Sequence, residues 1–154
     1  MAAGCLFSWL RATSSLSKYS QKHTIVIEQA GALGDIMIAI RTAAVAGTFY
    51  PADPAALQHE VDELLAGASC DIDASPNTCR PKALIVPHAG YRFSGPTAAT
   101  AYRCLSPVSR DISRVIVIGP CHRIPLRGMA APSAARFQTP LGDVPVDRQS
   151  IDKL

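Results

Sequence analysis

Apolar and polar positions alternate most regularly between residues 53 and 67. The apolar side chains recur three and four positions apart, which is the spacing of one helix face, at Leu57, Val61, Leu64 and Leu65. Asp53 followed by Pro54 is typical of a helix start, and Gly67 is typical of a helix end. The pattern therefore predicts an amphipathic helix with His59 on its solvent-facing side.

Two short apolar runs follow, and each of them stops at a proline with a histidine close behind. The runs are "ALIV" (residues 83–86) and "RVIVIG" (residues 114–119), and both are predicted to be strands buried on both faces. The Ala-rich segment between them, residues 94–105, predicts a helix that begins at Ser94 or Gly95. A strand, a helix and a strand within this length predict a βαβ unit with parallel strands.

His88 and His122 each lie just beyond the end of one predicted strand. Parallel strands end at the same edge of a sheet, and neighbouring strands lie about 4.8 Å apart. Two imidazoles at this edge would be within reach of one metal ion. The alternative is that each histidine is a loop residue hydrogen-bonded to a carbonyl group.

Three neighbours of the histidines allow two interpretations each. Tyr91 and Phe93 either line a pocket or belong to the core or the rim. Cys121 is either a reactive thiolate or, as we favour, an unreactive thiol. Near the carboxyl end, the sequence predicts a short strand around Val144 and the start of a helix in "DRQSIDKL".

Composition narrows the class of protein. A chain of 154 residues with 48% hydrophobic and 18% charged residues is typical of one domain folded around a core. The net charge of +3 comes from scattered residues, so nucleic acid is not an expected partner, and no apolar run approaches the roughly 20 residues that span a membrane. Five cysteines without a CxxC pair predict neither a disulfide framework nor a zinc knuckle, and favour a reducing, cytoplasmic setting.

The amino-terminal residues 1–36 differ from the remainder of the chain. Residues 1–27 are basic and serine-rich with no acidic residue, which is the composition of a transit peptide. The favoured alternative is a reading frame extended upstream of a true start at Met37. Residues 1–36 are therefore predicted to be a disordered leader or spurious extension, and residues 37–154 to be a truncated α/β domain.

Four segments together resemble one protein family. They are "AVAGTFYPADP", "PKALIVPHAGYRFSG", "RVIVIGPCHRIPL" and "FQTPLGDVPVD", and their order and spacing are similar to those of the Memo family, called AmmeMemoRadiSam system protein B in bacteria. The resemblance covers residues 43–154. It implies a fold like that of class III extradiol dioxygenases, with a central, mostly parallel sheet flanked by helices, of which this chain would hold an incomplete amino-terminal half.

The resemblance also implies a site. His88 and His122 would be two ligands of an iron or copper ion, and Phe49 and Phe93 would fall at pocket positions. With Tyr91 and Cys121, the neighbours of the histidines considered above, they make up the predicted pocket. The family usually has tyrosine where Phe93 stands, so a hydroxyl group is missing from the pocket. The third family ligand, a cysteine, would lie beyond Leu154, and neither Asp143 nor Cys121 is favoured as its substitute.

Two functions follow as hypotheses. The first is a metal-dependent redox protein with a non-haem dioxygenase-like site that acts on a small molecule, truncated here to an inactive form. The alternative is a non-catalytic protein that binds a peptide or another partner in the same crevice. A sheet cut in half is also expected to expose an edge and an apolar face.

Overall fold

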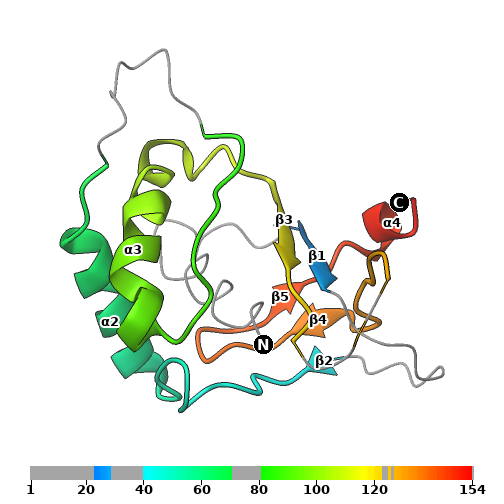
Figure 1. Ribbon diagram of the computed structural model, residues 1–154, viewed down its shortest axis with the longest axis horizontal. Helices are drawn as coiled ribbons and strands as arrows, with labels where there is room; N and C mark the ends of the chain where they lie inside the picture. The colour runs from blue at the N-terminus through cyan, green and yellow to red at the C-terminus, as the bar shows by residue number, and fades with distance from the viewer. Residues whose placement is uncertain (1–22, 29–39, 71–80, 123–124, 126, 154) are drawn as a thin grey trace.

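The computed structural model describes residues 23–28, 40–70, 81–122, 125 and 127–153. Its elements in chain order are β1 (His23–Glu28), β2 (Ile40–Arg41), α2 (Pro54–Ala66), α3 (Tyr91–Arg103), the 3-10 helix η2 (Ser106–Val108), β3 (Arg114–Gly119), β4 (Arg136–Phe137), β5 (Val144–Pro145) and α4 (Arg148–Ile151). Figure 1 shows the pair α2 and α3 on one side of the strands and α4 on the other. The described part of the chain is therefore an α/β structure, as predicted.

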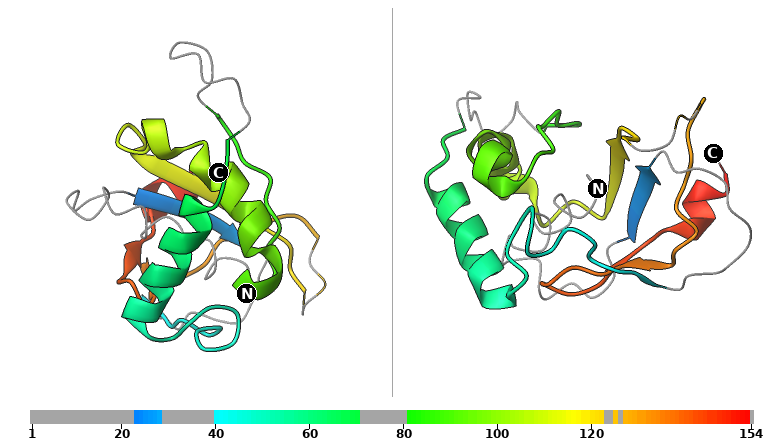
Figure 2. Two further views of the ribbon diagram at one scale, coloured as in Figure 1. Left: turned by 90° about the vertical axis from the view of Figure 1, so that its left-hand side faces the viewer. Right: turned by 60° about the horizontal axis from the view of Figure 1, so that its bottom comes forward.

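The described strands form two small sheets. β1 and β3 pair in parallel along their whole length, from His23 opposite Arg114 to Glu28 opposite Gly119. The second sheet is mixed and has the order β2-β4-β5, with a parallel pair followed by an antiparallel pair. The right-hand view of Figure 2 shows β1 beside β3, between the helix pair and α4.

Strand β1 belongs to the segment that was predicted to stand outside the fold. Its six residues, His23–Glu28, supply the parallel partner of β3. Basic and serine-rich composition describes the leader as a whole, but "HTIVIE" contains a run of β-branched residues that suits a strand. The division of the chain at residue 36 stays a prediction.

The predicted strand at residues 83–86 is wrong for this structure. These residues have no strand hydrogen bonds, and Ile85 is fully exposed, whereas Leu84 and Val86 pack against the core from partly buried positions. Alternating side chains thus bury one face of an extended segment that has no neighbouring strand among the described residues. The predicted βαβ unit is wrong for the same reason, because β3 takes its parallel partner from β1.

Helices α2 and α3 pack together to form the main core. Helix α2 has the predicted bounds, and the Asp53 carboxylate accepts a hydrogen bond of 2.8 Å from the Ala56 amide at its start. Leu57 and Val61 have no exposed surface. The core also contains Tyr91, Ala98, Ala99 and Tyr102 of α3, with Val45, Tyr50 and Leu65.

Helix α3 begins at Tyr91, three or four residues before its predicted start at Ser94 or Gly95. Pro96 lies inside the helix, where its ring removes one backbone hydrogen bond without ending the helix. Gly95 lets α2 approach closely, because a Cβ atom on it would lie 2.9 Å from a methyl carbon of Leu64. The earlier start turns Tyr91 toward the core.

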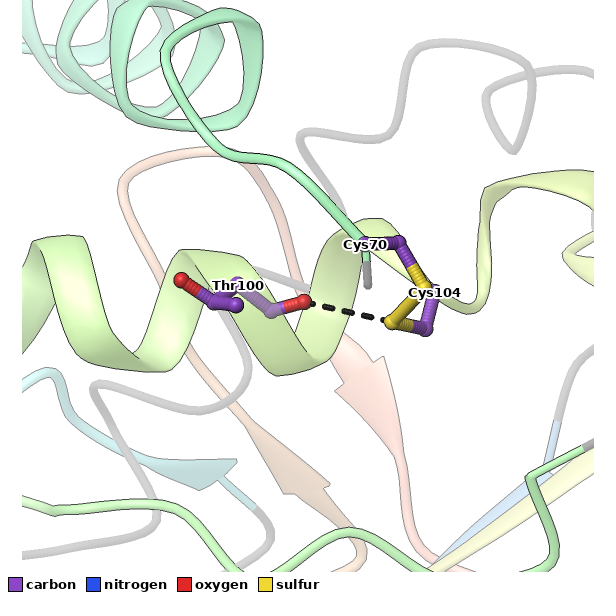
Figure 3. The surroundings of a disulfide bond; sticks show 3 residues. All are labelled: Cys70, Thr100 and Cys104. Atoms are coloured by element: carbon purple, nitrogen blue, oxygen red, sulfur yellow. Dashed lines mark hydrogen bonds between the residues drawn. A yellow bond between two sulfur atoms is a disulfide. The ribbon is translucent and has the colours of Figure 1, made fainter. Parts of the chain in front are cut away.

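The absence of a disulfide framework was also a wrong prediction. Cys70, three residues beyond the end-capping Gly67 of α2, is bonded to Cys104 at the end of α3, and their Cα atoms are 5.3 Å apart. Figure 3 shows the bond beside the last turn of α3, with the Cys104 sulfur 3.4 Å from the Thr100 carbonyl oxygen. Cysteine spacing could not reveal this pair, because its two members meet only through the packing of α2 on α3.

Strand β3 is buried on one face only. Val117 is 4% exposed, whereas Ile116 and Ile118 are 58% and 72% exposed. The prediction of a strand buried on both faces is therefore wrong, and the expectation of an exposed apolar face is confirmed for the described residues.

Among the described residues, no helix combines the length and apolar character needed to cross a membrane.

Glu60 gives a testable electrostatic effect on helix α2. Partial burial raises the pKa of Glu60, and the neighbouring Glu63 carboxylate adds to this rise. The folded state then binds this proton more tightly than the unfolded state, so stability falls as the pH rises through the raised pKa. We expect Glu60→Gln to raise the urea midpoint at neutral pH and to leave it unchanged at acid pH, where both states are protonated. A Glu60→Gln variant with the same urea midpoint as the wild type at neutral pH would contradict this.

Candidate functional site

The structure brings the imidazoles of His88 and His122 into direct contact. Their Nε2 atoms are 3.0 Å apart, and their ring centroids are separated by 5.1 Å with the ring planes 33° apart. His88 is half-buried and His122 is exposed. The two residues are 34 positions apart in the chain, so their meeting is a product of the fold.

The His88 segment is held against the turn that precedes α2. The Tyr91 amide donates a hydrogen bond of 2.8 Å to the Phe49 carbonyl oxygen. Gly90 fits closely at this point, because a Cβ atom on it would lie 3.2 Å from the Phe49 carbonyl oxygen and 3.3 Å from its Cα atom. Glycine therefore suits the point where the backbone following His88 meets the backbone of Phe49, because any larger residue would need this backbone to shift.

His122 reaches the site from the end of β3. The strand ends at Gly119, and Pro120 follows it, which prevents the ladder of hydrogen bonds from continuing there. The register of β3 is set by its pairing with β1. The sequence thus predicted the meeting of the two histidines from two strand ends, whereas the structure presents His88 from a segment without strand structure.

The contact between the Nε2 atoms has two chemical interpretations. If both rings are neutral and one carries its proton on Nε2, the distance of 3.0 Å is that of a hydrogen bond. If both Nε2 atoms are unprotonated, their lone pairs are available to a metal ion.

The geometry of the pair fits a metal ion. Metal-to-nitrogen distances of about 2.0 to 2.1 Å place two adjacent ligand nitrogens about 2.8 to 3.4 Å apart for right-angled to tetrahedral arrangements. The observed 3.0 Å lies within this range. Among the described residues, no group of three or more His, Cys, Asp or Glu side chains is placed to hold a metal ion. The pair therefore fits two coordination positions and leaves the others to different groups.

The four predicted pocket residues have different surroundings. Tyr91 is 2% exposed, and its ring packs on Tyr50 with centroids 5.7 Å apart, so it is a core residue. Phe93 is 78% exposed on the outer face of α3, where the Arg92 guanidinium lies 5.9 Å from its ring centroid. Phe49 is partly buried against the core, and Cys121 is a partly buried free thiol.

Sequence reasoning did not single out Ser94. Its side chain is 6% exposed, and its hydroxyl group donates to the Ala89 carbonyl oxygen at 2.8 Å, with the Gly90 carbonyl oxygen 3.3 Å away. The sequence showed Ser94 only as a possible first residue of a helix. Its contact with the His88 segment depends on the earlier start of α3, for which we see no signal in the sequence.

Comparison with known proteins agrees with the resemblance seen in the sequence. Residues 41–154 match the model of the family described as Memo-like protein. The chain is 36% identical over 114 residues to a memo-1 homologue of Caenorhabditis elegans, 37% identical over 114 residues to a MEMO1 family protein of Methanopyrus kandleri, and 34% identical over 119 residues to the MEMO1 protein of Mus musculus.

These matches cover 71% to 76% of this chain but only 30% to 39% of the three relatives. The chain thus corresponds to well under half of each relative's length. No solved structure matches it. The region that matches the family model contains both His88 and His122. The chain belongs to the Memo family.

Proposed function

We propose that His88 and His122 hold a redox-active metal ion, iron or copper, in a site of the non-haem dioxygenase type. The observation that supports this is the convergence of two imidazole Nε2 atoms at 3.0 Å, a separation suited to two ligands of one ion. When bound, such a metal supplies activation of dioxygen or polarisation of a substrate oxygen. The dioxygenase-like fold of the whole family protein is part of the same proposal.

The residues of this chain prepare the site in two ways. The contact of Gly90 and Tyr91 with Phe49 fixes the backbone next to His88, and the end of β3 presents His122. The exposure of His122 leaves the pair open to a small molecule approaching from solvent. We place the remaining ligands outside the described residues, because the described ones supply no third candidate.

A second candidate function is the binding of a peptide or protein partner without catalysis. Ile85 and Phe93, which precede and follow His88 in the chain, are 101% and 78% exposed. Large exposed apolar side chains that gather into one patch mark surfaces for protein partners. In this proposal the imidazoles would serve as hydrogen-bonding groups toward the partner.

Metal titration of the 154-residue chain tests the first proposal. We expect the wild-type chain to bind about one Fe(II) ion under anaerobic conditions, because the separation of the two Nε2 atoms suits two ligands of one ion. His88→Ala and His122→Ala should each lower the affinity at least tenfold, since loss of either imidazole removes one of two protein ligands. His59→Ala is the matched control, because His59 is an exposed histidine on α2 that pairs with Glu63.

The measurement is calorimetry for Fe(II) and for copper, combined with metal analysis of the dialysed protein. Equal binding by the wild type and all three variants would show that the metal is held elsewhere. A folded wild-type chain that binds neither metal would reject the site and leave the binding function as the remaining candidate.

A further inference from the structure

Ser94 stands out among the buried polar side chains of the described residues. These side chains belong to Ser94, Thr139 and Asp147. Thr139 bonds within its own turn, to the Gly142 carbonyl oxygen, and Asp147 caps α4 and pairs with Arg114. Ser94 instead bonds backward out of α3, to residues that follow His88 directly.

The two carbonyl groups near Ser94 belong to the segment that joins His88 to α3. The Ser94 hydroxyl group has the Ala89 carbonyl oxygen as its nearer acceptor, at 2.8 Å. The Gly90 carbonyl oxygen is 3.3 Å away and also accepts from the amides of Phe93 and Ser94. Side chains on a helix lean toward its amino terminus, which is why a first-turn serine can reach these groups.

The same segment is fixed on its other side by Phe49. The Phe49 carbonyl oxygen accepts from the Tyr91 amide at 2.8 Å, and Gly90 lies against the Phe49 backbone. Tyr91 is itself anchored in the core. Within the described part of the chain, the Ser94 hydroxyl group is therefore the group that is seen to hold the Ala89 carbonyl oxygen.

We propose that Ser94 is a positioning residue that orients the Ala89 peptide group and thereby holds His88 in contact with His122. The inference deepens the proposed metal site and rests on it for its metal-binding consequence. Ala89 is exposed, so its carbonyl oxygen can turn to water when the hydroxyl group is removed. The structural cost is then small, whereas the backbone between His88 and Gly90, no longer held by this bond, becomes free to move and to carry the His88 side chain away from His122.

Three variants separate positioning from folding. Ser94→Ala removes the hydroxyl group, and Ser94→Thr retains it as the rescuing substitution, because threonine in helices also bonds to preceding carbonyl groups. Thr100→Ala is the matched control, because Thr100 makes the same kind of bond within α3, to the Pro96 carbonyl oxygen at 3.2 Å. Circular dichroism and urea unfolding of each variant establish that α3 remains folded.

The first measurement is the set of NMR chemical shifts of the imidazole nitrogens, recorded on the metal-free chain. In the wild type and in Thr100→Ala, we expect the signals of His88 and His122 to differ from those of His59, which is the exposed internal reference. In Ser94→Ala both should approach the His59 values, and Ser94→Thr should restore the wild-type values. Unchanged signals in Ser94→Ala, or wild-type signals already equal to those of His59, would overturn the proposal.

The second measurement is Fe(II) affinity, which we expect to fall about tenfold in Ser94→Ala and to stay unchanged in Thr100→Ala. Wild-type affinity in a folded Ser94→Ala chain would also overturn the positioning role. If the wild-type chain binds no metal, the proposed function fails by itself. The imidazole signals still decide whether Ser94 positions His88, so the two failures are distinguishable.

Discussion

Replacing Leu57 by alanine is expected to lower the free energy of unfolding by about 2 to 5 kcal/mol. Leu57 has no exposed surface and lies in the core between α2 and α3. The substitution removes buried apolar atoms and leaves a cavity that neighbouring side chains fill only in part. Since small domains are stable by about 5 to 15 kcal/mol, this one change removes a large share of the total.

Urea unfolding followed by circular dichroism measures this effect. Met129→Ala is the matched control, because Met129 is a large apolar residue that is 69% exposed. We expect the control to change the free energy of unfolding by less than about 0.5 kcal/mol. A loss of under about 1 kcal/mol in Leu57→Ala would show that Leu57 is not enclosed as the structure describes.

Reduction of the disulfide is expected to lower the free energy of unfolding by about 4 kcal/mol, if the bond acts by restricting the unfolded chain. The bond joins residues separated by 34 positions, and this loop length sets the size of the entropic effect. It also ties the chain beyond α2 to the end of α3, the two helices that carry the core. A double variant, Cys70→Ala with Cys104→Ala, should show the same loss under oxidising conditions.

The measurement is the urea midpoint with and without a phosphine reductant. The double variant should not respond to the reductant, whereas the wild type should fall to the level of the variant. Cys121→Ser is the control, because Cys121 is a free thiol and its replacement should leave the response to the reductant intact. A wild-type chain with the same midpoint in both conditions would contradict the expected effect of the bond.

Elements with local signals were predicted well from the sequence. Helix α2 combines a cap, a proline at its first position and an apolar face, all within fourteen consecutive residues from Asp53 to Ala66. Strand β3 has the predicted bounds because six residues with a β-branched core specify an extended chain. The short strand at Val144 and the helix at Arg148–Ile151 also occur where they were expected.

Features that depend on distant partners were predicted poorly. The run at residues 83–86 has strand composition, but only a neighbouring strand can supply its hydrogen bonds, and composition does not specify that neighbour. The spacing of Cys70 and Cys104 in the sequence likewise does not show that they pair, because the two residues meet only through the packing of α2 on α3. The helix face formed by Tyr91, Ala98 and Tyr102 explains why Tyr91 is a core residue and Phe93 is not, once the start of α3 is known.

The candidate site was predicted only in part. The repeated sequence of an apolar run, a proline and a histidine predicted that His88 and His122 would meet, and the structure places their Nε2 atoms in contact. The sequence did not predict which backbone carries His88, because that depends on the packing of Gly90 against Phe49. Their role as metal ligands stays a prediction.

The bond between Cys70 and Cys104 also changes the connectivity of the molecule. It closes a covalent ring of polypeptide that runs from residue 70 to residue 104, and His88 lies on this ring whereas His122 lies outside it. If a protease cuts the backbone once at the exposed Lys82, both new chain ends remain joined through the sulfur atoms. The His88 imidazole therefore belongs to a closed ring of polypeptide, whereas the His122 imidazole belongs to an open part of the chain. A single backbone cut within the ring leaves His88 covalently attached to both α2 and α3.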